Sequence, residues 1–406
     1  MVSNTKRILS NSLSLLFIQI ANYIAPFLVL PYLSRTLGVE GFGTVALLMS
    51  IATIASIVTD YGFNLSAAHD IAKSSDNKEY INRYIGTVFT IKIILVLAIL
   101  FFLFLYSTFG TDLLASNYLL PVVFFTILSR TFQPTWFFQG IEKMRSVTVY
   151  MVIAKLMYLI LVFIFVHNKG DEWIVMLCFG VSNLVASIIS IFCIYKEGYK
   201  VKVSSWPMMK SVFKNSSGFF LSRVSVSIYT ALSTFIVGSV AGLHQAALYS
   251  SCEKLYQGGQ SLTSPISQAL FPYMARTGDK KLFYKFVLFS IIPMIVGCAI
   301  CIHFSSDILS FIFGPEFAKA DRILDLFLAC TVIVFIAVNF GYPAFASINK
   351  VRVANITVMF GAIVQCLSLL FLYFTDSISA LSVTVAVLIT ESVVMSLRLI
   401  LFFKLK

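Results

Sequence analysis

Long apolar runs recur along the whole chain, and they constrain its fold more than any other feature. The chain has 406 residues, of which 59% are hydrophobic and only 12% are charged. Soluble domains are about 25% charged, so roughly half of the usual solvating surface is missing. Because the apolar character extends over the full length, we predict a polytopic membrane protein with many spanning helices.

Counting about 20 apolar residues per crossing predicts twelve transmembrane helices. The longest connection, at 196–214, lies at the midpoint and carries five Lys and a Trp206-Pro207 break, as expected for a linker. We therefore predict an all-α integral membrane protein with two six-helix lobes, at residues 1–200 and 201–406. The predicted spans are residues 12–33, 43–66, 84–106, 118–138, 147–166, 173–195, 213–237, 246–271, 284–304, 324–347, 353–374 and 379–403.

Two short patterns repeat between the halves of the chain. Leu37-Gly38-Val39-Glu40 and Ala241-Gly242-Leu243-His244 are offset by 204 positions. Pro134 and Pro343 each stand seven to nine residues before a basic turn. Because six spans are an even number, the two halves insert in the same direction, which predicts a parallel repeat.

Lys and Arg are distributed unevenly between the two sides of the predicted membrane. One side carries both termini and twenty Lys and Arg, and the other side carries four. The positive-inside rule therefore places both termini in the cytoplasm. The net charge of +12 is mostly this topological signal, and no nucleic-acid-binding motif accompanies it.

The sequence offers little for metal or covalent chemistry. Its four His lie in different segments without a metal-ligand pattern, and its seven Cys all fall inside apolar runs as packing residues. We predict no metal site, no cofactor and no enzymatic activity.

Six Lys and Arg lie inside the predicted spans, where an ionised side chain costs about 2.5 to 3.5 kcal/mol and needs a partner, water or a function. Arg130 and Arg223 lie too deep to reach the surface and are the leading candidates for substrate contact. Lys254 is the third candidate. For Lys92, Lys155 and Arg398, snorkelling or pairing explains the positions equally well.

Three carboxylates also lie in the spans: Asp60, Glu253 and Glu391. We expect them to balance charge or to carry a coupling proton or Na⁺, and expect Asp60 to pair with a basic residue. Glu253 and Lys254 are adjacent and point about 100° apart, so they are poor partners for each other. The basic excess favours an anionic ligand, and Arg binds phosphate through a bidentate fork.

Several phrases of the chain resemble those of the polysaccharide transporter family, the Wzx-type O-antigen flippases of the multidrug/oligosaccharidyl-lipid/polysaccharide exporter (MOP) superfamily. The resemblance covers most of residues 8 to 350. It is carried by Pro31-Tyr32-Leu33-Ser34-Arg35-Thr36-Leu37-Gly38-Val39-Glu40-Gly41-Phe42-Gly43, Asp60-Tyr61-Gly62-Phe63-Asn64-Leu65-Ser66-Ala67-Ala68, Pro134-Thr135-Trp136-Phe137-Phe138-Gln139-Gly140, Glu253-Lys254-Leu255 and Ser264-Pro265-Ile266-Ser267-Gln268-Ala269-Leu270-Phe271-Pro272.

This resemblance implies a MATE-like fold and a flippase function. Such a flippase moves undecaprenyl-pyrophosphate-linked O-antigen repeat units from the cytoplasmic to the periplasmic leaflet of the bacterial inner membrane by alternating access. We expect membrane lipids to surround the protein, while contacts with an O-antigen polymerase and a chain-length regulator stay open.

Two other functions stay open at this point. A small-molecule antiporter on the same architecture is disfavoured by the basic excess. A membrane polymerase or glycosyltransferase is less consistent with the chain, because the longest loop has only about 18 residues, too few for the large catalytic loop of such enzymes. The sequence leaves the sugars, the coupling ion and the oligomeric state undetermined.

Overall fold

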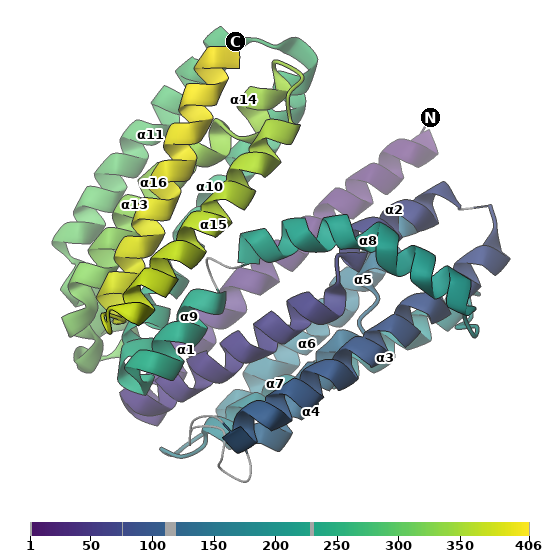
Figure 1. Cartoon of the computed structure of the whole chain (residues 1–406), viewed down its shortest axis with the longest axis horizontal. Coiled ribbons are helices and arrows are strands. Elements are labelled where there is room, and N and C mark those ends of the chain that lie inside the picture. Colours follow the sequence, from purple (N-terminus) through teal and green to yellow (C-terminus); the bar gives the residue numbers. More distant parts are fainter. Residues whose placement is uncertain (1, 75, 110–118, 228–230, 406) are drawn as a thin grey trace. The chain divides into compact units, whose positions relative to one another are not determined.

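The computed structural model describes the backbone of residues 2–74, 76–109, 119–227 and 231–405, and this part of the chain is helical with no β-strand (Figure 1). The elements, in chain order, are α1 (Val2–Asp60), α2 (Phe63–Lys73), α3 (Lys78–Phe109), α4 (Leu119–Thr131), α5 (Thr135–Gly140), α6 (Met144–Phe165), α7 (Glu172–Lys196), α8 (Trp206–Ser227), α9 (Ser233–Ile236), the π-helical turn η2 (Val237–Ala241), α10 (Leu243–Thr277), α11 (Lys280–His303), α12 (Ser305–Phe313), the 3₁₀ turn η3 (Pro315–Ala320), α13 (Asp321–Asn339), α14 (Tyr342–Ala346), α15 (Arg352–Phe374) and α16 (Ala380–Leu405).

Eight helical stretches of the described chain are long and apolar enough to cross a membrane. The all-α membrane fold is therefore confirmed, whereas the count of twelve spans stays a prediction. The eight stretches are Phe27–Lys73, Lys78–Leu105, Met144–Phe165, Glu172–Lys196, Lys280–His303, Pro315–Ala346, Arg352–Phe374 and Ala380–Leu405.

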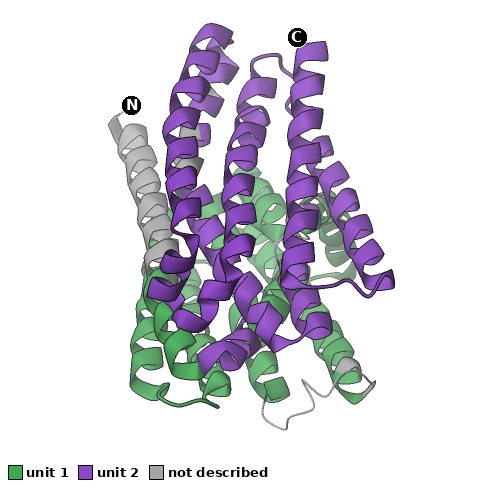
Figure 2. Cartoon of the chain, turned by 90° about the vertical axis from the view of Figure 1, so that its left-hand side faces the viewer, with its two compact units in different colours: residues 1–37, 48–224 green, residues 38–47, 225–406 purple. Residues whose placement is uncertain are grey.

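The chain consists of two compact units, each with its own packed helices (Figure 2). Unit 1 comprises residues 1–37 and 48–224, and unit 2 comprises residues 38–47 and 225–406. The division falls inside α8, whereas the sequence places its lobe boundary at residues 200 and 201. The connection before α8 belongs to unit 1 because it is hydrogen-bonded to α3, as Lys200 N donates to Asn82 Oδ1 (2.8 Å) and Lys202 N donates to Asn82 O (3.2 Å).

The two repeated patterns adopt the same backbone conformations. Gly38 interrupts α1 with φ 73° and ψ −177°, and Gly242 precedes α10 with φ 92° and ψ 170°. Only glycine enters this region readily, because it lacks a Cβ. The interruption at Gly38 separates the first two predicted spans, although their helices are otherwise continuous.

The second repeated pattern is a broken span that ends in a left-handed turn. The predicted spans at 118–138 and 324–347 are each interrupted before Pro134 and near Gly341, and each continues as a short helix, α5 or α14. Glu142 (φ 58°) and Asn349 (φ 56°) follow these helices in the same conformation. In each case the following residue closes the turn: Lys143 N donates to Phe138 O (2.8 Å), and Lys350 N donates to Phe345 O (2.9 Å). The repeat is therefore one of local geometry as well as of sequence.

Each unit has its own aromatic core. In unit 1 the core contains fully buried aromatic side chains of α2, α3, α5 and α6, including Phe63, Tyr84, Trp136 and Tyr150. In unit 2, α10, α11, α13, α14, α15 and α16 contribute side chains such as Phe283, Phe345 and Phe402. These cores include side chains of α3, α10 and α16, which carry several of the ionisable residues described next.

Candidate functional site

Asp60 has a buried basic partner, Lys92. Asp60 is the last residue of α1, directly before Tyr61 (φ 45°) and Gly62 (φ 78°), which end the helix. The Lys92 ammonium on α3 lies 3.9 Å from Asp60 Oδ1, and the side chains of Lys92 and Asp60 are largely buried, 4% and 15% exposed. Sequence reasoning expected a basic partner for Asp60 but did not identify Lys92, since nothing in the sequence fixes the packing of α3 on α1.

Lys92 also closes the end of α4. Its ammonium donates a hydrogen bond of 3.0 Å to the carbonyl oxygen of Thr131, the last residue of α4. Carbonyls in the last turn of a helix have no partner within the helix, and a cation there is favourable. Lys92 therefore joins the ends of α1 and α4 and is held in place by both.

Arg130 is the neighbouring cation, and its environment differs from that of Lys92. It is exposed on the surface of unit 1, and its guanidinium carbon lies 6.0 Å from the centroid of the Phe179 ring on α7. Among the described residues, its guanidinium makes no ion pair within 4.0 Å, although Asp60 attracts it from further away. Two cations thus surround one carboxylate, and the buried Lys92 is the closer of the two.

Side-chain amides and hydroxyls hold α4 against α7 around Arg130. Gln133 Nε2 donates to Asn183 Oδ1 at 3.1 Å, and Ser187 Oγ donates to the carbonyl of Ser129 at 2.5 Å. A Cβ on Gly180 would lie 2.6 Å from the Phe125 ring, so a glycine is needed where the two helices approach each other. These contacts determine where the arginine stands.

Arg223 lies on α8, but its side chain is outside the described residues. Its role in substrate contact therefore stays a prediction from the sequence.

In unit 2, Glu253 is a buried carboxylate held by neutral donors. It is 4% exposed, and Thr234 Oγ1 of α9 donates to its Oε2 at 2.9 Å. The Gln257 side chain, one turn along α10, also hydrogen-bonds this carboxylate. Within the described part of the chain, Glu253 makes no ion pair within 4.0 Å.

Lys254 points to the same glutamine as Glu253. Its ammonium donates to Gln257 Oε1 at 3.2 Å, and it is half-buried. Adjacent helical residues diverge, as the sequence predicts, so the lysine and the glutamate meet at Gln257 and not directly. Gln257 therefore links a carboxylate to an ammonium through its two amide atoms.

Arg398 on α16 is a structural residue that ties three helices together. Its guanidinium donates to Thr357 Oγ1 (2.9 Å), to the carbonyl of Ala337 (2.7 Å) and to the carbonyl of Ala354 (3.4 Å). These contacts join α13, α15 and α16 and use most of its donors. The sequence left snorkelling and pairing open for Arg398. The structure favours pairing, because the guanidinium binds two backbone carbonyls and one hydroxyl.

Glu391 lies on α16, two helical turns before Arg398, and is half-buried. Its neighbour Thr390 donates to Gln365 Oε1 at 2.7 Å, and Gln365 Nε2 donates to Ser233 Oγ at 3.3 Å. The attraction of Arg398 reaches Glu391. The structure thus places a polar chain of α9, α15 and α16 beside this carboxylate.

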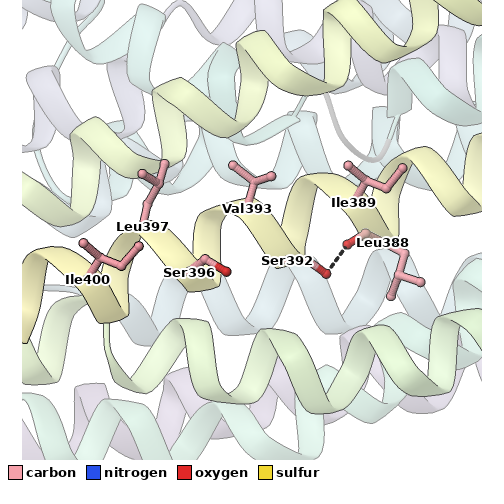
Figure 3. Close-up of a pocket in the computed structure, with 7 residues that line it drawn as sticks. All are labelled: Leu388, Ile389, Ser392, Val393, Ser396, Leu397 and Ile400. Carbon is pink, nitrogen blue, oxygen red and sulfur yellow. Dashed lines mark hydrogen bonds between the residues drawn. The ribbon is translucent and has the colours of Figure 1, made fainter.

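No group of three or more His, Cys, Asp or Glu that could hold a metal ion occurs among the described residues. A hollow on α16 also lacks suitable chemistry (Figure 3). Its lining is apolar apart from two serines, and Ser392 Oγ donates to the carbonyl of Leu388 at 2.7 Å. The ionisable groups of α3, α4 and α10 are therefore the candidate sites.

Comparison with known proteins gives relatives over nearly the whole chain. The family described as "Polysaccharide biosynthesis protein" matches residues 8–278. A "Putative O-antigen transporter" of Shigella dysenteriae is 28% identical over 370 residues, covering 88% of this chain and 91% of that protein. A protein of the same description from Escherichia coli K12 is 31% identical over 286 residues, covering 68% and 67%.

Solved structures show the same fold at low sequence identity. An inward-facing multidrug resistance MATE family transporter of the MOP superfamily superposes with a TM-score of 0.71 at 15% identity, covering 96% of this chain and 97% of the other. The inward closed lipid II flippase MurJ superposes with a TM-score of 0.73 at 13% identity, covering 98% and 90%. The predicted MATE-like fold is therefore confirmed, and the chain is a multi-pass membrane protein.

Proposed function

The chain belongs to the polysaccharide biosynthesis protein family, and on that premise we propose that it is a flippase for undecaprenyl-pyrophosphate-linked O-antigen repeat units. The cargo would cross from the cytoplasmic to the periplasmic leaflet of the inner membrane, with both termini of the protein in the cytoplasm. The descriptions of two curated relatives as O-antigen transporters support this cargo. Because those relatives are named transporters, we assign the chain no enzymatic reaction.

The observation that carries this proposal is the unequal pairing of the two cations in unit 1. Asp60 is paired with Lys92, while Arg130, an exposed residue, makes no ion pair within 4.0 Å among the described residues and has its guanidinium over the Phe179 ring. An Arg guanidinium presents several donors in a planar fork that fits phosphate oxygens. Arg130 would therefore bind the pyrophosphate of the lipid-linked cargo.

Lys254 is the second cation of the proposal. It is half-buried and engages only a neutral amide, Gln257 Oε1, among the hydrogen bonds described. Arg223, on α8, is proposed as a third contact from the sequence alone. Each of these residues would attract an anionic group and disfavour the cationic cargo of a drug antiporter.

Glu253 and Glu391 would carry the coupling ion. Glu253 is buried and accepts hydrogen bonds from neutral groups, and the charge of the adjacent Lys254 acts on it from beyond ion-pair distance. Its ionised form would gain from binding a cation or a proton. Asp60, by contrast, balances the charge of Lys92. Alternating access of the two predicted lobes, driven by ion uptake, would expose the cargo to each leaflet in turn.

The test is deletion of the gene followed by assay of surface O-antigen and of lipid-linked repeat units on each leaflet. A flippase deletion traps single repeat units on the cytoplasmic leaflet. Complementation with Arg130→Ala together with Arg223→Ala should fail to restore export at normal protein levels, whereas Arg322→Ala, at an exposed arginine of α13, should restore it.

Two results would contradict the proposal. Intact export by the double variant would show that Arg130 and Arg223 are not needed to bind the cargo. Repeat units that reach the periplasmic leaflet of the deletion strain but stay unpolymerised would place the protein after the flipping step, with the polymerase or the chain-length regulator.

A further inference from the structure

The connection between α7 and α8 exposes apolar and basic side chains together. Val203 is 95% exposed and Trp206 is 72% exposed, and Lys200, Lys210 and Lys214 are also exposed. We call these five residues the Lys-Trp surface. All of them belong to unit 1. A tryptophan so fully exposed beside lysines is typical of the membrane interface, where the indole ring lies at the level of the lipid headgroups.

The exposure of these side chains does not result from a loose loop. The segment before α8 lies along the first turns of α3, where Thr87 Oγ1 and Ser204 Oγ are hydrogen-bonded at 2.6 Å. A Cβ on Gly86 would lie 1.6 Å from the carbonyl oxygen of Lys202, so the backbones approach too closely for any other residue. Together with the two hydrogen bonds that Asn82 accepts from the backbone of Lys200 and Lys202, these contacts hold Val203 and Trp206 outward.

The first turns of α8 have two distinct faces. Val212 and Ser216 are buried, and the hydroxyl of Ser216 is hydrogen-bonded to that of Ser66 on α2 at 2.8 Å. Trp206, Lys210 and Lys214 are spaced four residues apart on another face, which places them in a row at intervals of about 6 Å along the helix. The helix therefore packs through one face and presents the aromatic ring and two ammonium groups on the other.

The neighbouring carboxylates are already paired. Glu197 is paired with Lys143, and Glu79 is paired with Lys202 and Arg83. None of the ion pairs in the described chain involves Lys200, Lys210 or Lys214. The Lys-Trp surface thus has an excess of about three positive charges that complements anionic headgroups, each contributing about fivefold in affinity near such a surface.

We propose that the Lys-Trp surface binds the headgroups of anionic phospholipids, with Trp206 and Val203 inserted at the boundary of the acyl chains. The lysines contact the phosphate groups and the indole anchors the start of α8 in the interface. This surface shares no residue with the proposed cargo contacts Arg130, Arg223 and Lys254, and it does not depend on the flippase function. Its ligand is the bulk anionic lipid of the membrane.

Tryptophan fluorescence tests this proposal directly. The chain has three tryptophans, and Trp136 is fully buried while Trp173 is 37% exposed. The full-length protein is reconstituted in vesicles of phosphatidylcholine that contain either brominated phosphatidylglycerol or brominated phosphatidylcholine at the same mole fraction. Subtracting the signal of Trp206→Phe isolates the quenching of Trp206, which we expect to be severalfold stronger with the brominated anionic lipid.

In a variant with Lys200, Lys210 and Lys214 all changed to Gln, the two brominated lipids should quench Trp206 equally. The matched control changes three exposed lysines of unit 2, Lys281, Lys285 and Lys350, to Gln and removes the same charge. It should keep the preference. Circular dichroism verifies that each variant is folded. We expect both variants to fold because the changed lysines are exposed.

Three results would overturn the proposal. They are quenching of Trp206 by neither lipid, equal quenching by both lipids in the wild-type protein, and loss of the preference in the control variant to the same extent. The first would place the surface in water, and the other two would show that the lysines at these positions do not select anionic lipid.

Discussion

The buried carboxylates of the two units have different partners. In unit 1, Asp60 is paired with the buried ammonium of Lys92, and an additional cation, Arg130, stands exposed beside them. In unit 2, Glu253 is buried with only Thr234 and Gln257 as hydrogen-bond partners among the described residues. We therefore expect the first arrangement to offer a positive charge to an anion, and the second to offer a carboxylate to a cation or a proton.

The largest expected effect is the loss of stability when Asp60 loses its basic partner. Lys92→Met leaves Asp60 buried without its partner and removes the bond to Thr131, and breaking a buried pair costs about 3 to 5 kcal/mol. We expect a large fall in the thermal unfolding midpoint, measured in detergent. Adding Asp60→Asn to this variant should recover part of the loss.

The same measurement on Glu253→Gln provides the comparison. Because no ion pair is broken and the new amide keeps hydrogen-bonding capacity, this variant should unfold within about 1 kcal/mol of the wild-type protein. A loss as large as that of Lys92→Met would show that Glu253 is ionised and paired in the folded protein, and the contrast between the units would fail.

The second effect concerns transport by Arg130. Charge-assisted hydrogen bonds contribute about 1.5 to 3 kcal/mol, so Arg130→Ala should lower repeat-unit export roughly tenfold to a hundredfold at matched protein levels. Arg130→Lys should retain an intermediate rate, since it keeps the charge without the planar fork. Wild-type activity of both the Ala and the Lys variant would exclude phosphate binding by the guanidinium.

The third effect is a change in coupling. With Gln at position 253 the side chain carries no exchangeable charge, so export should lose its dependence on the transmembrane ion gradient while the protein stays folded. Initial rates in vesicles with and without an imposed proton or Na⁺ gradient measure this dependence. Unchanged stimulation by the gradient would assign coupling to Glu391 or to another residue.

The smallest effect tests the hydrogen bond from α9. Thr234→Val removes the donor to Glu253 while nearly keeping the side-chain shape, which should cost about 1 kcal/mol of unfolding free energy. Thr384→Val, at a buried threonine of α16 whose hydroxyl donates to a backbone carbonyl, is the matched control. Only the variant at 234 should also shift the ion concentration that gives half-maximal export.

Much of the candidate site could be inferred from the sequence because intramembrane charges are rare and costly. That cost drew attention to Asp60, Arg130, Glu253 and Lys254, all of which lie in the described clusters. Two of their partners were not predictable, because Lys92 and Thr234 approach through helix packing that local sequence does not encode. Gln257 lies one turn from Glu253 and Lys254 on the same helix, so that contact follows from local spacing. Arg398 illustrates the limit, as its hydrogen bonds to backbone oxygens carry no sequence signature.

The sequence by itself determined that this chain is an all-α membrane protein, that it contains a repeat, and which positions hold charge inside the membrane. Hydropathy, turn glycines and the solvation cost of charge are local properties, so each can be read without coordinates. Only the tertiary structure decided which charges neutralise each other and which stay available. That outcome depends on distances of 3 to 4 Å between side-chain and backbone atoms of helices far apart in the chain. A small change in helix packing changes these distances and with them the strength of the ion pair.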